Sequence, residues 1–358
     1  MRLLALAAAA ASLFAACVTT ASAAGPSPAP TPAPAPGRSW ALPQIKNVVD
    51  AGLLAPSVAA FRPDERLTQS ALADALELLA LAQAQPTVVR YRAVVPERAV
   101  TIRELDAALV GFAGLGDAAR SVTAQLRAAG LAPKAGAGTE VVARLLGLRY
   151  NHPASQDSLE LGPNDPATRA EAAYSLAQLL GLSRWSSEWV RSEVASLDLP
   201  DLTELQRQVL SRAVSFVGYP YIWGGTSERP QRLFGKAPVP GGFDCSGLVW
   251  RVFKLEPFPG ASALATVLRG RTTYELSGEV GPAKRIRKPE SLQPGDIVFQ
   301  GAAGSKSKPA QVDHAGIYLG GGWFVHSSRH GTTLHPFEGW YRERFAWARR
   351  PLREAGLS

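Results

Sequence analysis

A run of glycines near the C-terminus separates two segments that have the composition of β-strands. Residues 312–319 and 323–327 are rich in β-branched and aromatic side chains, and Gly320–Gly322 lies between them, which predicts a β-hairpin. His314 lies in the first strand and His326 in the second. With an odd number of loop residues, both side chains share one sheet face, directly opposite or one diagonal step apart. An even number would place them on opposite faces.

The segment 243–253 has the pattern of an amphipathic helix with a cysteine at its start. Asp244 is a favourable N-cap residue, so Cys245 is expected in the first helical turn. The positive end of the helix dipole favours a thiolate at that place, and we expect the thiol pKa to be lowered. A buried, unreactive cysteine is the alternative interpretation. The apolar stripe that supports the helix consists of Leu248, Val249, Val252 and Phe253.

Residues 1–23 have the features of an export signal. A positively charged residue precedes an apolar stretch, and small residues at 21–23 suit a cleavage site. Lipid attachment at Cys17 is a second possibility, because the residues before it loosely resemble a lipoprotein box. In both cases the remaining chain is expected to be exported to the cell wall or cell surface. Cleavage after residue 23 leaves Cys245 as the only thiol, which favours a catalytic role in an exported protein.

Proline alternates with small residues in the segment 24–39, which predicts an extended linker. Residues 40–182 are rich in alanine and leucine with helical periodicity, and one pattern occurs in them three times. In each copy a proline lies five residues before a threonine that opens an apolar-periodic stretch. Threonine is a good helix N-cap, and a glutamate three residues later can accept the backbone N–H of the capping residue. Glu104 and Glu171 are therefore expected to complete capping boxes in the second and third copies. The three threonines are Thr68, Thr101 and Thr168.

This region resembles the S-layer homology domain, in which three repeats commonly anchor proteins to secondary wall polymers. The third copy, at 168–171, matches the signature of that family most closely, whereas the first two copies depart from it. By this resemblance, Arg169 is the candidate contact for an anionic polymer. A role of Thr168 as a helix cap alone is the alternative. Residues 183–201 are expected to connect this region with a compact α+β domain at 202–352.

Cys245 and the two histidines of the hairpin suit nucleophilic catalysis. His314 would take the thiol proton and pass it to a leaving amine, while His326 would bond the other nitrogen of the His314 ring and fix its tautomer. A backbone N–H at the helix start would contribute to an oxyanion hole. No metal or other cofactor is predicted, because the five histidines lack metal-ligand spacing. The net charge of +8 favours anionic partners, but no nucleic-acid-binding motif accompanies it.

Four ordered motifs resemble the NlpC-type family of papain-like cell-wall endopeptidases; they lie at 219–225, 243–249, 292–299 and 314–320. The resemblance implies an α+β fold in which a helix packs on an antiparallel sheet. It also implies hydrolysis of the bond between γ-D-glutamate and the diamino acid in peptidoglycan stem peptides. By resemblance, the catalytic triad is Cys245, His314 and His326. A weaker match is Arg271–Thr273, which resembles a stretch that borders the substrate cleft.

Three further residues are assigned by the same resemblance. Tyr221 matches an aromatic residue beside the nucleophile, whose hydroxyl assists the oxyanion or the substrate. Asp244 and Ser246 match positions that line the substrate cleft, with a pure capping role as the alternative for Asp244. The loops 226–242 and 301–310 are longer than the family usually shows, and both are expected to rim the cleft.

Three other functions are compatible with parts of the pattern. An amidase that acts between muramic acid and L-alanine would use the same residues. An acyltransferase is disfavoured, because members of that branch often carry the histidine before the cysteine, and Cys245 precedes both histidines here. A non-catalytic wall-binding adaptor predicts the loss of Cys245, His314 or His326, and all three are present.

Overall fold

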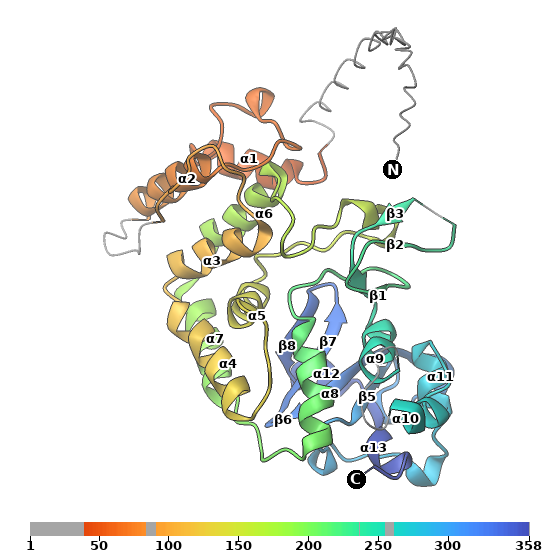
Figure 1. The fold of residues 1–358 in the computed structure, drawn as a ribbon. Helices are drawn as coiled ribbons and strands as arrows, with labels where there is room; N and C mark the ends of the chain where they lie inside the picture. Colours follow the sequence, from red (N-terminus) through yellow and green to blue (C-terminus); the bar gives the residue numbers. More distant parts are fainter. Residues whose placement is uncertain (1–38, 84–90, 236, 255–260, 358) are drawn as a thin grey trace, which may run out of the picture. The chain divides into compact units, whose positions relative to one another are not determined.

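The computed structural model describes residues 39–83, 91–235, 237–254 and 261–357 (Figure 1). The predicted export signal, Cys17 and all but the end of the predicted linker lie outside the described residues. Within these residues, no helix combines the length and the apolarity that a membrane span requires.

The first half of the described chain is helical. Its α-helices are α1 (Leu42–Asp50), α2 (Gln69–Ala82), α3 (Ile102–Phe112), α4 (Gly116–Ala128), α5 (Ala137–Leu145), α6 (Arg169–Leu180) and α7 (Arg184–Ser196). Two 3-10 turns, η2 (Val58–Ala60) and η3 (Ala154–Leu159), lie in the connections. Alanine and leucine favour helices, and the buried leucines of α2, α3 and α6 pack together in the core.

The three threonine-containing segments meet in a closed ring of backbone hydrogen bonds. The residue before each threonine donates its N–H to the equivalent residue of another segment: Leu67 to Ala167, Ala167 to Val100, and Val100 to Leu67, each at 2.8 Å. The threonine that follows then caps a helix with its side chain, as predicted for α2, α3 and α6. The three copies therefore share the same backbone pairing and the same threonine cap at their helix starts.

The two predicted capping boxes differ. Glu104 completes its box, since its carboxylate accepts the Thr101 N–H at 2.9 Å. Glu171 does not, and this prediction was wrong: its side chain is buried, 3.4 Å from Arg149. The free-energy cost of burying a carboxylate without a counter-charge is larger than the cost of leaving the helix N-terminus without a second hydrogen-bond acceptor.

Five ionisable side chains are buried together beneath these helices. They are Asp106, Glu140, Arg144, Arg149 and Glu171. Arg149 lies 3.8 Å from Asp106 and 3.4 Å from Glu171, and Arg144 lies 3.7 Å from Glu140. Burial, and secondarily the charge of Asp106, raises the pKa of Glu140 to about 8, so this carboxyl is mostly protonated at neutral pH. Burial also raises the pKa values of Asp106 and Glu171, and the charge of Arg149 opposes both shifts.

The segment 183–201, predicted as a connector, is mostly helix. Ser183 caps α7, which packs on α4 and buries Val190 and Val194. The Ser/Glu-rich composition of this segment reflects the exposed face of an amphipathic helix. The connection to the next helix is therefore shorter than expected, from residue 197 to residue 203.

The second half combines helices with an antiparallel five-stranded sheet of order β8-β7-β6-β5-β9. The strands are β5 (Ile297–Gly301), β6 (Val312–Gly320), β7 (Trp323–Ser328), β8 (Gly331–Pro336) and β9 (Phe345–Arg349). The helices are α8 (Glu204–Ser215), α9 (Cys245–Phe253), α10 (Ala261–Val267), α11 (Thr273–Gly278), α12 (Gly339–Glu343) and α13 (Pro351–Glu354). Helix α9 packs on β6 and β7 (Figure 1), in agreement with the predicted helix-on-sheet arrangement.

The two long loops contain short elements. Four two-residue strands occur in the first: β1 (Thr226–Ser227), β2 (Gln231–Arg232), β3 (Pro238–Val239) and β4 (Gly242–Phe243). The second holds the 3-10 turns η6 (Gly304–Lys306) and η7 (Pro309–Gln311). Two more 3-10 turns precede β5, namely η4 (Pro282–Lys284) and η5 (Pro289–Ser291).

Strands β6 and β7 form the predicted hairpin, but the two histidines share a sheet face for a reason that was not predicted. The loop has two residues, Gly321 and Gly322, and an even number was expected to separate the histidines. However, the register shifts between Tyr318 and Gly320, so that a bulge adds one unpaired residue. His326 consequently pairs with Gly316 and shares a sheet face with His314, one diagonal step away.

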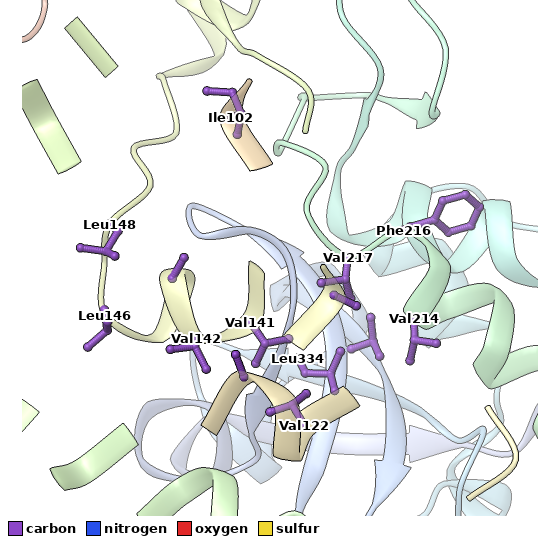
Figure 2. Packing of buried hydrophobic residues seen from close by; sticks show 14 of the residues in the cluster. Ile102, Val122, Val141, Val142, Leu146, Leu148, Val214, Phe216, Val217 and Leu334 are labelled. Carbon is purple, nitrogen blue, oxygen red and sulfur yellow. The ribbon is translucent and has the colours of Figure 1, made fainter. Parts of the chain in front are cut away.

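One continuous apolar core joins the helices of the first half to the sheet of the second. Figure 2 shows Val122 of α4, Val141 of α5 and Leu334 of β8 beside one another, with Val214 of α8 nearby. Helix α5 packs on β8. Buried apolar surface thus joins the helical region to the edge strand of the sheet.

Candidate active site

Helix α9 begins at the predicted cysteine. Asp244 is the N-cap, and its Oδ1 accepts the N–H of Gly247. Cys245 is buried and its thiol is free. The prediction that this residue occupies the first turn of a helix is therefore confirmed.

The expected effect on the thiol is not observed. Burial, and secondarily the Asp244 carboxylate, raises the pKa of Cys245 to about 12. The backbone N–H groups of Ala315 and Ser246 face the sulfur and oppose this shift, with a smaller contribution from Arg271. The prediction of a lowered pKa was wrong, because desolvation of the thiolate outweighs the favourable N–H groups at the helix start.

The two histidines lie against each other. His314 Nε2 and His326 Nδ1 are 2.9 Å apart, and both rings are buried. Burial lowers the pKa of His314 to about 4, and burial together with His314 lowers the pKa of His326. At neutral pH both rings are therefore uncharged, and one of them donates the shared proton. The Ala315 N–H that faces the Cys245 sulfur belongs to the residue after His314, so β6 passes the start of α9 next to His314 in the chain.

The phenol of Tyr221 is a further neighbour of the Cys245 thiol. Its segment forms a parallel bridge with Phe243, two residues before Cys245. Burial, followed by the neighbouring Cys245 and Asp244, raises the pKa of the Tyr221 phenol, which is protonated at neutral pH. The hydroxyl is thus available as a hydrogen-bond donor beside the sulfur.

Arg271 organises the residues around the helix start. Its guanidinium donates to Asp244 Oδ1 (3.1 Å) and Oδ2 (3.1 Å), to Ser246 Oγ (2.8 Å) and to the carbonyl of Gly224 (3.1 Å). Asp244 also accepts the Gly224 N–H at 2.9 Å. Both oxygens of this carboxylate are therefore engaged. Sequence reasoning placed Arg271 at the border of the cleft and missed this ion pair, which joins residues 27 positions apart.

Replacing Arg271 with alanine is expected to slow alkylation of Cys245 by iodoacetamide at alkaline pH. The Asp244 carboxylate would lose its counter-charge, and the thiol pKa would rise further. Arg271→Lys keeps the charge and should show a smaller effect. The rate is followed by mass analysis of the peptide that contains Cys245, and equal rates in wild type and Arg271→Ala would contradict this role.

A cavity of about 630 Å³ opens beside the histidine pair. Its lining consists of Tyr221, His314, Ser328, Arg329, His330, His335, Glu338, Gly339, Trp340 and Tyr341. Sequence reasoning missed the residues from 328 onward, whose only signal was the density of aromatic and histidine side chains after the second strand. None of the described residues of the two long loops lines this cavity. The first loop instead lines a separate one with Trp223 and η3.

Arg169 lies elsewhere, at the N-terminus of α6. Its guanidinium lies 5.1 Å from the centroid of the Phe61 ring and donates to the carbonyl of Leu54. The structure therefore separates this residue from the cluster that contains Cys245, His314, His326, Tyr221, Asp244 and Ser246.

Comparisons with known proteins agree with this placement. The model of the NlpC/P60 family matches residues 218–350, and the chain thus carries an NlpC/P60 domain at its C-terminus. This domain is mixed helix and sheet with an antiparallel sheet. The match does not include the N-terminal helices, and the resemblance of that region to S-layer homology repeats finds no support in these comparisons.

Several curated relatives are murein, peptidoglycan or glutamyl-bond hydrolases by name. Murein DD-endopeptidase MepH of Escherichia coli (strain K12) is 31% identical over 40% of this chain and 45% of its own length. Gamma-DL-glutamyl hydrolase of Bacillus subtilis (strain 168) is 30% identical over 41% of this chain and 28% of its own. The chain therefore spans less than half of either relative. The crystal structure of an NlpC/P60 family protein from Bacillus cereus ATCC 10987 is 26% identical, with 44% and 43% coverage and a TM-score of 0.31.

Proposed function

We propose that the C-terminal domain is a cysteine endopeptidase that hydrolyses the γ-D-glutamyl–diamino acid bond of peptidoglycan stem peptides. The observation that carries the proposal is the 2.9 Å contact between His314 and His326, on the strands against which the Cys245 helix packs. Peptidoglycan endopeptidases among the relatives support the substrate class. An exported protein that acts in the cell wall follows from this substrate.

The mechanism follows from the uncharged state of the three side chains. When His314 Nε2–H donates to His326 Nδ1, the other nitrogen of the His314 ring is free to accept the thiol proton. Because the thiol pKa is raised, the proton leaves as the sulfur attacks the carbonyl carbon, not before. The Cys245 N–H and the Tyr221 hydroxyl would stabilise the oxyanion.

Collapse of this intermediate breaks the C–N bond, and the proton passes from His314 to the leaving amine. Water then attacks the thioester carbonyl and gives a proton to His314. The C–S bond breaks, the acid leaves, and His314 returns the proton to the sulfur. His326 holds the His314 ring in place through both steps. Asp244 and Ser246, fixed by Arg271, would border the bound peptide on the side of the helix start.

Digestion of purified muropeptides by the full-length protein, with mass analysis of the products, tests this function. We expect fragments that end in γ-D-glutamate, absent from the Cys245→Ala digest. Fragments cleaved at the D,D cross-link would identify a DD-endopeptidase instead. A free lactyl group together with an intact stem peptide would identify an amidase. Full retention of peptidoglycan binding without any cleavage would favour the adaptor.

The pH dependence of hydrolysis provides a second test. His314 must be neutral to accept the thiol proton, and burial lowers its pKa from 6.5 to about 4. The base form therefore predominates above pH 4 and is lost as the pH falls through that value. We expect the acid limb of the kcat/KM profile near pH 4. A limb near 6.5 would contradict the role of burial at this ring.

We also propose that the three threonine-containing copies anchor the enzyme to an anionic secondary wall polymer, with Arg169 as a contact. Supporting this are the signature at 168–171 and the ring that brings the three helix starts together. The guanidinium group of arginine favours anions. The test is sedimentation of the protein with isolated walls before and after removal of secondary polymers. Equal binding to stripped walls would exclude this anchor.

A further inference from the structure

Within the C-terminal domain, the extended segment around Tyr221 forms backbone hydrogen bonds along one of its edges only. In its bridge with Phe243, the Ile222 N–H donates to the Phe243 carbonyl and the Phe243 N–H donates to the Pro220 carbonyl, both at 3.2 Å. The N–H and C=O of Tyr221 itself point the other way, because alternate residues of an extended strand direct these groups to opposite sides. Two half-buried polar groups therefore need partners from elsewhere.

Asn151, in the connection between α5 and α6, meets both groups. The Tyr221 N–H donates to Asn151 Oδ1 at 2.7 Å, and Asn151 Nδ2 donates to the Tyr221 carbonyl at 3.0 Å. The side-chain amide thus takes the place of a neighbouring strand. Two residues further on, the Trp223 N–H donates to Asp157 Oδ2 at 3.1 Å, so that the same connection holds the segment twice.

The residues on either side of Asn151 are themselves fixed. The ring of Tyr150 stacks on Trp40 with 4.8 Å between centroids and 11° between planes. The backbone N–H of His152 donates to Glu160, and the Nδ1 atom of His152 lies 3.3 Å from the same carboxylate oxygen. Little conformational entropy remains to be lost when Asn151 bonds Tyr221.

We propose that Asn151 is a positioning residue for Tyr221, so that the helical region is part of the active site in addition to any anchoring role. The inference rests on the proposed function of Tyr221 beside the Cys245 sulfur. By fixing both backbone groups, Asn151 sets where the phenol hydroxyl lies relative to the oxyanion. A small displacement there is costly, because stabilisation of the transition state depends on geometry.

A double-mutant cycle in the full-length protein tests this role. Asn151→Ala, Tyr221→Phe and the double variant are compared on purified stem peptides, with Asn47→Ala, on the exposed side of α1, as the matched control. Asn151→Ala should lower kcat/KM about tenfold or more, mainly through kcat, while the control stays near wild type. In the Tyr221→Phe background the same change should cost little, because the hydroxyl that Asn151 positions is already absent.

Asn151→Asp keeps the acceptor for the Tyr221 N–H but replaces the donor to the Tyr221 carbonyl by a second oxygen. This variant should hydrolyse the peptide at a rate between those of the wild type and Asn151→Ala. A multiplicative loss in the double variant, or a lowered Tm with unchanged kcat, would mean that Asn151 is only structural. If the wild type cleaves no muropeptide, the proposed function fails, yet alkylation of Cys245 still decides the inference. Asn151→Ala should then change the alkylation rate in the same direction as Tyr221→Phe, and an unchanged rate would overturn it.

Discussion

Alanine in place of His314 is expected to slow stem-peptide hydrolysis as strongly as alanine in place of Cys245, by at least about a thousandfold in kcat/KM. The two side chains act as a unit: without the imidazole nothing accepts the proton of a thiol whose pKa is raised to about 12. The double variant should therefore be no slower than either single variant. The loss of kcat/KM in His326→Ala should be smaller, because this change removes the group that orients the base and leaves the base itself in place.

These rates are measured with the muropeptide whose cleavage is detected in the wild-type digest. Each variant must keep the wild-type Tm, since His314 and His326 are buried and their loss leaves space in the sheet. Hydrolysis by His314→Ala at more than a small fraction of the wild-type rate would show that another group removes the proton. A His326→Ala variant slower than His314→Ala would reverse the proposed roles of the two rings.

The largest expected loss of stability lies far from the cleft, at Arg149. Replacing it with methionine leaves Asp106 and Glu171 buried without their nearest positive charge, at 3.8 and 3.4 Å. We expect the free energy of unfolding to fall by about 3–5 kcal/mol, the usual consequence of removing one partner of a buried ion pair. Chemical denaturation of the full-length protein measures this loss.

Arg191→Ala is the matched control. Arg191 is exposed and donates to the carbonyl of Gly114, and its loss should change the free energy by no more than about 0.5 kcal/mol. A second variant, Arg149→Met with Glu171→Leu, should recover part of the stability, because it also removes one of the uncompensated carboxylates. If Arg149→Met is as stable as the control, the buried charges do not depend on this arginine.

Features that depend on nearby residues could be predicted from the sequence. The start of α9 at Cys245, the two strands of the histidine hairpin and the threonine caps all follow from short patterns, and the structure contains each of them. The four ordered motifs also located the domain that the NlpC/P60 family model matches at 218–350.

Features that depend on residues far apart in the sequence could not be predicted. The bulge at Leu319 restores the shared face of the histidines, yet no turn signal distinguishes it from a regular strand. The direction of the thiol pKa shift depends on how completely other elements cover Cys245, which a helix-start argument does not include. Likewise, the pairing of Arg271 with Asp244 and the burial of Glu171 are set by packing between separate segments.

The ring of hydrogen bonds among Leu67, Val100 and Ala167 has a consequence for synthesis of the chain. Each segment gives three backbone N–H groups to the other two segments, one to one of them and two to the other, so two copies alone leave donors and acceptors unmatched. The ribosome delivers the third copy last, about 67 residues after the second. Until then the first two copies lack the partner that completes their pairing, so the N-terminal region reaches its final form only after α6 has emerged.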